Sequence, residues 1–136
     1  MISIGLDIGS VAAKGVLIQG GRQYQMMVPT GWSPRTAGEQ LIDDLLQSSG
    51  HRPHDVHSIV VTGYGRVAVM EASRTVTEIK CHARGVAELY PQIRTIIDIG
   101  GQDSKVIQID SQGRVVDFAM NDKCAAGTGR FLQVMA

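Results

Sequence analysis

Two acids stand at the ends of short apolar runs, and each is followed by a glycine turn and a lysine. The sequence reads Asp-Ile-Gly, four further residues and Lys, once from Asp7 to Lys14 and again from Asp98 to Lys105. An acid at this place suits a metal ion, because a carboxylate repels phosphate but holds Mg²⁺, directly or through the waters that this ion keeps. Glycine suits a phosphate, because a backbone without Cβ can bring its N–H groups close to an anion. The pattern therefore indicates a site for phosphate and Mg²⁺.

The two stretches form an internal repeat of a strand–turn–strand–turn–strand unit. A second turn follows each copy, at Gly20-Gly21 in the first and at residues 111–113 in the second. One copy alone would be better explained as an ordinary hairpin with a glycine turn. Duplication with the same acid and the same lysine favours a binding site. Two such loops facing each other would hold the phosphates and metal of a nucleotide from both sides.

The rest of the pattern predicts the elements that position these loops. Alternating or β-branched apolar runs indicate strands, and apolar residues three or four positions apart indicate helices. The expected strands are 2–7, 14–19, 24–28, 58–62, 96–99, 105–110 and 115–120, and the expected helices are 36–48, 78–90 and a third from Gly129 onward. Gly50 and Pro91 are expected to end the first two helices. These elements predict an α/β fold.

Three further features could carry chemistry, and each also has a structural explanation. Trp32, in the loop before the first helix, is interpreted as a packing anchor over that helix rather than as a residue that stacks on a ligand. Arg66 follows a glycine turn at the end of a strand, where α/β folds bind ligands; it could reach a phosphate, pair with an acid or lie on the surface. His51, His54 and His57 are interpreted as an exposed linker rather than a metal site, because they lie in a proline-containing connector.

The two cysteines differ in their surroundings. Cys81 lies inside an expected helix beside His82, and adjacent helical residues point about 100° apart, so we interpret it as a packed thiol. Cys124 lies in a polar run before an expected helix, next to Lys123, where the helix dipole and the lysine stabilise a thiolate. A thiolate is the form that binds iron–sulfur clusters or reacts. The alternative is a cysteine that fills a loop pocket.

Charge and hydropathy limit the classes of partner. Thirteen basic and thirteen acidic residues cancel, which gives no electrostatic reason to expect nucleic acid or an anionic membrane as a partner. No apolar run is long enough to span a bilayer, and Met1 leads into a strand without the basic start of a signal peptide. We therefore expect a cytoplasmic protein, with no membrane partner and no structural disulfide.

Together these motifs resemble the activator proteins of 2-hydroxyacyl-CoA dehydratases and the related activase components of benzoyl-CoA reductases, within the actin–Hsp70–sugar kinase superfamily. The resemblance covers the whole chain and is carried by residues 6–10, 62–66, 78–83, 97–105 and 120–131. Residues 121–129 are the most specific part, since other members of the superfamily lack this cysteine motif. The resemblance implies a first actin-like ATPase (ribonuclease H-like) domain with a mixed sheet over residues 1–93. Residues 94–136 would be the opening strands and helix of a second, duplicated domain.

The same resemblance implies an ATP-binding and ATP-hydrolysing protein that delivers a low-potential electron to a CoA-ester dehydratase or reductase. In that family two subunits share one [4Fe–4S] cluster, so we expect a homodimer or higher self-association, with ATP or ADP and Mg²⁺ in the interdomain cleft of each subunit. A second cluster cysteine and the adenosine-binding glycines belong to the family's second half. We therefore expect ATPase activity of the full-length family rather than of this chain alone.

Roles are carried over by position. The residues assigned to the nucleotide phosphates are Asp7, Gly9, Ser10 and Lys14 in the first loop and Gly100, Gly101 and Gln102 in the second. The acids assigned to Mg²⁺ are Asp7 and Asp98. Either Gln102 or Asp103 would position the attacking water, and Cys124 would bind the cluster. Cys81 matches a family position that is not assigned to the cluster.

Two other functions are compatible with the loops. One is a small-molecule kinase of the sugar kinase type, against which the Cys124 motif argues. The other is a non-catalytic nucleotide-binding module that needs a partner chain. Iron content separates the activator from the kinase, and ATP turnover separates the activator from the module.

Overall fold

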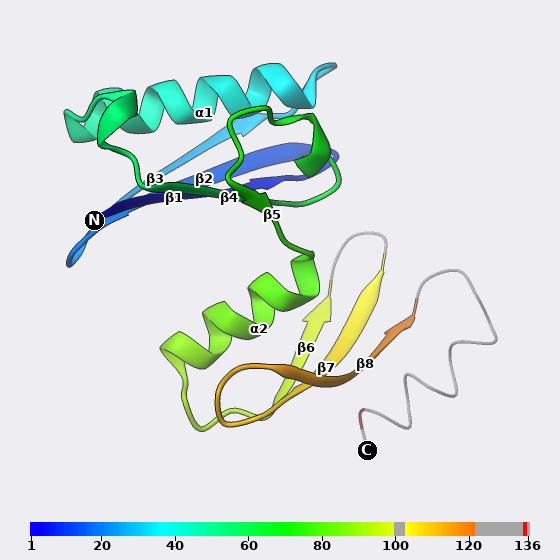
Figure 1. Ribbon diagram of the computed structural model, residues 1–136. Coiled ribbons are helices and arrows are strands. Elements are labelled where there is room, and N and C mark those ends of the chain that lie inside the picture. The colour runs from blue at the N-terminus through cyan, green and yellow to red at the C-terminus, as the bar shows by residue number, and fades with distance from the viewer. Residues whose placement is uncertain (100–102, 122–134, 136) are drawn as a thin grey trace. The chain divides into compact units, whose positions relative to one another are not determined.

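The computed structural model describes residues 1–99, 103–121 and 135 of the chain. The chain divides into two compact units, Met1–Thr77 and Glu78–Ala136, and each holds one copy of the repeat (Figure 1). This division falls earlier in the chain than the expected domain boundary after residue 93, which stays a prediction.

The first unit is built on a five-stranded mixed sheet in the order β3-β2-β1-β4-β5. Its strands are β1 (Ile2–Ile8), β2 (Ala12–Gln19), β3 (Arg22–Pro29), β4 (Ser58–Thr62) and β5 (Arg74–Thr75). The first three form antiparallel hairpins, whereas β4 joins β1 in parallel and β5 joins β4 in parallel. The expected mixed sheet is confirmed, although the short β5 carries no pattern that predicts it.

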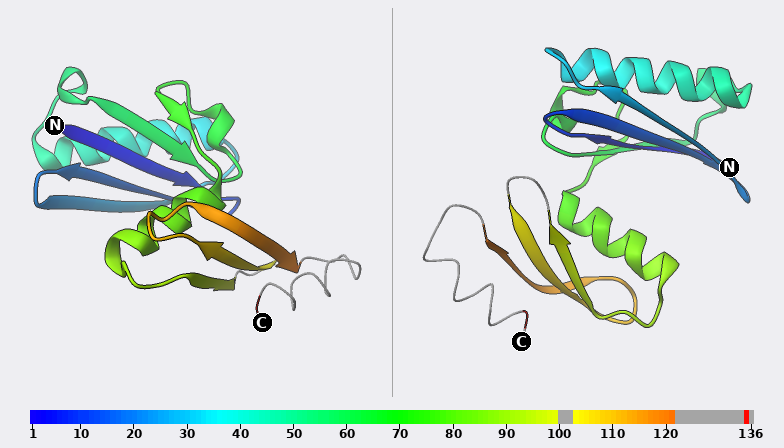
Figure 2. Two further views of the ribbon diagram at one scale, coloured as in Figure 1. Left: turned by 60° about the horizontal axis from the view of Figure 1, so that its bottom comes forward. Right: turned by 180° about the vertical axis from the view of Figure 1, so that it is seen from behind.

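Helix α1 (Pro34–Ser49) covers one face of this sheet (Figures 1 and 2). The Ser33 side chain caps it by accepting from Thr36 N, and Gly50 ends it in the left-handed conformation at φ 75°, as its place in the sequence predicts. The apolar residues of β1 alternate with polar or small ones, so that one face of the strand packs on the helix. The most deeply buried side chains of this core are Ile4, Ile8, Leu17, Leu41, Leu45 and Val61.

The second unit packs one helix on an antiparallel sheet in the order β6-β7-β8. Its elements are α2 (Glu78–Leu89), β6 (Thr95–Ile99), β7 (Ser104–Ile109) and β8 (Val115–Asn121). Ala83 of the helix contributes with Ile107 and Ile109 of β7 to one core cluster. The turn between β7 and β8 is held by Asp110 Oδ1, which accepts from the backbone N–H groups of Gln112 and Arg114. These two backbone donors lower the pKa of the Asp110 carboxyl.

The helices and strands follow the sequence expectations closely. Each expected helix or strand within the described ranges is present, with ends displaced by at most two residues; the helix expected from Gly129 lies outside them. Two short 3₁₀ helices, η1 (Pro53–Asp55) and η2 (Arg66–Ala68), were not predicted. Among the described residues, no helix combines the length and the hydropathy needed to cross a membrane.

Replacing Leu41 by alanine tests the core between α1 and its sheet. Leu41 is fully buried, so Leu41→Ala should lower the free energy of unfolding by about 2–5 kcal/mol through lost burial and a residual cavity. Leu89→Ala is the matched control, because Leu89 is largely exposed on α2 and its truncation should cost less than about 0.5 kcal/mol. Urea unfolding followed by circular dichroism measures both, and equal losses in the two variants would contradict this core.

Candidate functional site

The acid and the lysine of each repeat lie directly opposite each other on neighbouring strands. Asp7 on β1 pairs with Lys14 on β2, and Asp98 on β6 pairs with Lys105 on β7. Both pairs belong to antiparallel hairpins, and in both the acid precedes the last residue of its strand. The repeat seen in the sequence is therefore also a repeat of backbone register.

The first acid is accessible and weakly paired. Asp7 Oδ2 lies 3.4 Å from Lys14 Nζ, and the two side chains are 33% and 53% exposed. An ion pair this exposed contributes little to stability, because water competes for both charges. Asp7 lies between Leu6 and Ile8, which are buried under α1, so its carboxylate is on the opposite face of the sheet. Both charges can therefore act on a ligand.

The turn after Asp7 is fixed by its own backbone and by Thr30. Gly9 N donates to Ala12 O, and a Cβ at Gly9 would come within 2.7 Å of that oxygen. The buried Thr30 donates from Oγ1 to Gly9 O at 2.7 Å and from its backbone N to Val11 O at 2.9 Å. Ser10 is exposed at the tip of this held turn. Sequence reasoning missed Thr30, which carries no signal except its place directly after β3.

The turn after β4 lies directly against Asp7. Gly63 has φ 95°, and a Cβ there would lie 2.5 Å from Ile8 O and 2.6 Å from Asp7 Oδ1. Nearby, Gly65 N donates to Ile8 O at 2.9 Å. Only glycine permits this approach, which places a bare stretch of backbone beside the carboxylate. The adjacent Thr62 Oγ1 is buried without a hydrogen-bond partner among the described residues.

The groups gathered here are of types that could hold Mg²⁺ and phosphate. Four groups lie at one end of β1 and β4. They are the one-third exposed carboxylate of Asp7, the hydroxyl of the exposed Ser10, the ammonium group of Lys14 and the backbone at Gly63. Carboxylates and hydroxyls suit Mg²⁺ and its waters, and an ammonium suits phosphate. Arg66 does not add to this set, because its Nη1 donates to Gly63 O at 2.9 Å and so braces the turn.

The second acid has different partners. Asp98 Oδ2 lies 3.0 Å from His82 Nδ1 on α2, whereas Lys105 Nζ donates to Asp103 Oδ1 at 2.9 Å. The Lys105 side chain is only 11% exposed. Burial alone would lower the pKa of Lys105, but the hydrogen bond to Asp103 and the charges of Asp103, Asp98 and Glu78 outweigh it and raise this pKa. Lys105 is therefore a fixed cation.

Four assigned residues cannot be placed. Gly100, Gly101 and Gln102 of the second loop and the proposed cluster ligand Cys124 lie outside the described residues. Asp103, the other residue assigned to the attacking water, lies beside Lys105. Their assignments stay predictions.

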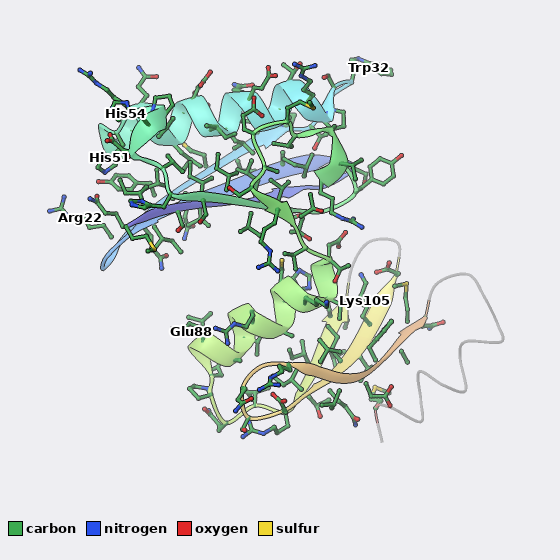
Figure 3. All side chains as sticks on the ribbon, viewed as in Figure 1. Arg22, Trp32, His51, His54, Glu88 and Lys105 are labelled. Atoms are coloured by element: carbon green, nitrogen blue, oxygen red, sulfur yellow. The ribbon has the colours of Figure 1, made fainter. Side chains whose placement is uncertain are left out.

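The interpretation of Trp32 as a packing anchor is wrong. Trp32 is fully exposed and projects beyond the N-terminal end of α1 (Figure 3), because Gly31 takes a left-handed conformation and the Ser33 cap starts the helix immediately afterwards. Cys81 is half-buried in α2 rather than fully packed.

Two of the three connector histidines lie near the same carboxylate: His51 Nδ1 is 3.9 Å from Asp55 Oδ2, and His54 Nε2 is 3.4 Å from Asp55 Oδ1. His51 Nε2 also lies 2.8 Å from Gln19 Oε1, and His57 Nδ1 accepts from Ile2 N. Within the described ranges, no group of three or more His, Cys, Asp or Glu side chains is arranged to hold a metal ion.

The fold and the duplicated loop define the class of protein. Over its whole length the chain superimposes with a TM-score of 0.81 on the structure of (R)-2-hydroxyglutaryl-CoA dehydratase component A from Acidaminococcus fermentans, with 38% identity and 53% of that structure covered. The activator of 2-hydroxyisocaproyl-CoA dehydratase from Clostridium difficile, solved with bound ADPNP, gives a TM-score of 0.76, 47% identity and coverage of 100% of this chain and 51% of the other. The expected actin-like ATPase fold is thereby confirmed.

The sequence identifies the family. Residues 4–136 match the BadF/BadG/BcrA/BcrD ATPase family, and the chain belongs to this family. The 2-hydroxyisocaproyl-CoA dehydratase activator of Clostridioides difficile is 47% identical over 137 residues, which cover 100% of this chain and 52% of that protein. The chain thus spans about half the length of the curated relatives that it matches.

Replacing Gly63 by alanine tests the close approach of the β4 turn to Asp7. Gly50→Ala is the matched control, because Gly50 also has positive φ but a Cβ there would meet open space, so it should cost about 1–2 kcal/mol of left-handed strain alone. Gly63→Ala should cost a further 1–3 kcal/mol or so from overlap with Ile8 and Asp7. Urea unfolding of both variants measures the difference, and equal costs would contradict the close approach.

Proposed function

We propose that the chain supplies the phosphate- and Mg²⁺-binding loops of an ATP-hydrolysing activator of a CoA-ester dehydratase or reductase. The observation that carries this proposal is the shared register of the two hairpins, in which an acid next to the end of the first strand faces a lysine on the second. Membership in an ATPase family and likeness to dehydratase activators support it.

Each loop contributes a defined set of groups in this proposal. Asp7 and Asp98 hold Mg²⁺, and the groups that contact phosphate are Gly9, Ser10 and Lys14 in the first loop and Gly100, Gly101 and Gln102 in the second. Mg²⁺ supplies neutralisation of charge on the phosphates. Gln102 or Asp103 positions the attacking water. Of these two, Asp103 already accepts a hydrogen bond from the Lys105 ammonium through Oδ1.

The electron-transfer part of the proposal depends on Cys124. As a thiolate it would bind a [4Fe–4S] cluster, which supplies one-electron chemistry, and a cluster takes four cysteine ligands. One cysteine from each of two copies provides two of them, so the proposal includes a homodimer and further cysteines in the part of the relatives that this chain does not span. The electron would pass to the dehydratase or reductase that the activator serves.

Calorimetric titration of the chain with ADP, with Mg²⁺ or with a chelator, tests the nucleotide site. Asp7→Asn and Asp98→Asn should each weaken Mg²⁺-dependent ADP binding about 10-fold or more, because each removes a charge that holds the metal. Asp43→Asn, the same change at an exposed position of α1, should bind like wild type. If wild type binds no ADP, or if all three variants behave alike, the nucleotide site proposed for this chain is wrong.

Iron and sulfide content after anaerobic reconstitution tests the cluster. Wild type should retain iron that Cys124→Ser loses, since the serine hydroxyl is a poor iron ligand beside a thiolate. Cys81→Ser is the matched control and should retain the iron, because Cys81 is a half-buried helix residue. Loss of iron in Cys81→Ser but not in Cys124→Ser would reverse the assignment. Absence of iron from folded wild type would show that this chain alone lacks the necessary ligands.

A further inference from the structure

His82, on α2, contacts one of the two repeated acids, and the Asp–Lys pattern of the repeat does not account for this contact. Its Nδ1 lies 3.0 Å from Asp98 Oδ2, and the side chains of His82 and Asp98 are 39% and 29% exposed. The sequence presents His82 only as the neighbour of Cys81. The contact instead follows from the helix, because His82 lies one turn after Glu78 and next to Ala83, which is buried against the sheet.

The contact exists because the two units place their helices on different faces of the repeat. In the first unit α1 packs on Leu6 and Ile8, which puts Asp7 on the opposite face. In the second unit α2 packs on Ile96, and Asp98, two residues further along β6, is on that same face. A helix side chain therefore reaches the second acid, whereas the first acid has its cross-strand lysine.

The two acids also have different side-chain partners. Lys14 sets a full positive charge beside Asp7, but the corresponding Lys105 is hydrogen-bonded to Asp103. Asp98 instead has a ring nitrogen of His82 3.0 Å from its Oδ2; a planar imidazole fixes the direction of such a contact, whereas the flexible side chain of a lysine does not.

We propose that His82 is a positioning residue that holds one oxygen of Asp98 through Nδ1 and so presents the other oxygen to Mg²⁺. The proposal rests on the proposed function, in which Asp98 is a metal-binding acid. Outer contacts of this kind fix the orientation of a metal-binding side chain, and their loss typically lowers metal affinity about 10–100-fold.

The tautomer of His82 tests the contact without nucleotide. In ¹⁵N-labelled chain, the neutral His82 ring should carry its proton on Nδ1, whereas most free imidazoles carry it on Nε2. Asp98→Ala should abolish this preference, and His54, exposed beside Asp55, serves as the reference ring in the same spectrum. An Nε2-protonated His82 that does not respond to Asp98→Ala would overturn the proposal.

The Mg²⁺ dependence of ADP binding tests the positioning role. His82→Ala should raise the Mg²⁺ concentration needed for half-maximal ADP binding about 10-fold, with ADP affinity in chelator unchanged. His82→Asn should recover most of the loss, because its amide nitrogen can occupy the place of Nδ1. Lys80→Ala, at an exposed position of α2, is the matched control and should behave like wild type.

The outcomes separate the two proposals. Wild type that binds no Mg²⁺–ADP would overturn the proposed function. Wild type that binds it, with His82→Ala indistinguishable, would overturn the positioning role alone. Equal loss of affinity with and without Mg²⁺ in His82→Ala would show a merely structural residue, as would failure of His82→Asn to recover binding.

Discussion

The alternation of β1 between two faces of its sheet is the constraint from which the first site follows. Leu6 and Ile8 must lie under α1 to form the core, which leaves Asp7 no place except the opposite face, beside Lys14 on β2. The parallel pairing of β1 with β4 then sets Gly63 against the same carboxylate. The register that buries Leu6 and Ile8 is therefore also the register that exposes Asp7. A shift of β1 by one residue would bury the acid and expose its two apolar neighbours.

The second unit repeats the strands but not the packing. The register of Asp98 with Lys105 reproduces that of the first pair, yet α2 lies on the face that carries the acid, and Ile97 and Ile99 on β6 are more than half exposed. The two acids therefore have unlike surroundings: one faces an exposed ammonium, and the other an imidazole. A duplicated hairpin has acquired two electrostatic environments through the placement of a helix.

Much of this arrangement could be predicted from local sequence. Strand alternation and the end of α1 at Gly50 are set by neighbouring residues, and the repeated spacing predicted a duplicated strand–turn–strand unit. What the sequence could not show depends on residues far apart in the chain. Examples are the hydrogen bonds of Thr30 to the first loop and the contact of His82 with Asp98. To predict them, one would have to know which face of its sheet each helix or loop packs against. Trp32 was misjudged because large aromatic residues are usually buried, whereas this one precedes a helix cap.

The mixed order of the first sheet has a consequence for the sequence of folding events. The hairpins of β1, β2 and β3 join residues close in the chain, and such contacts form early. The parallel pairing of β1 with β4 must close a loop of about fifty residues, at a greater cost in chain entropy. Asp7 and Lys14 are therefore expected to meet well before Gly63 arrives, so the backbone approach of the β4 turn to Asp7 is completed only in the last, cooperative step. A chain stopped before that step would carry the charges of the site without its backbone.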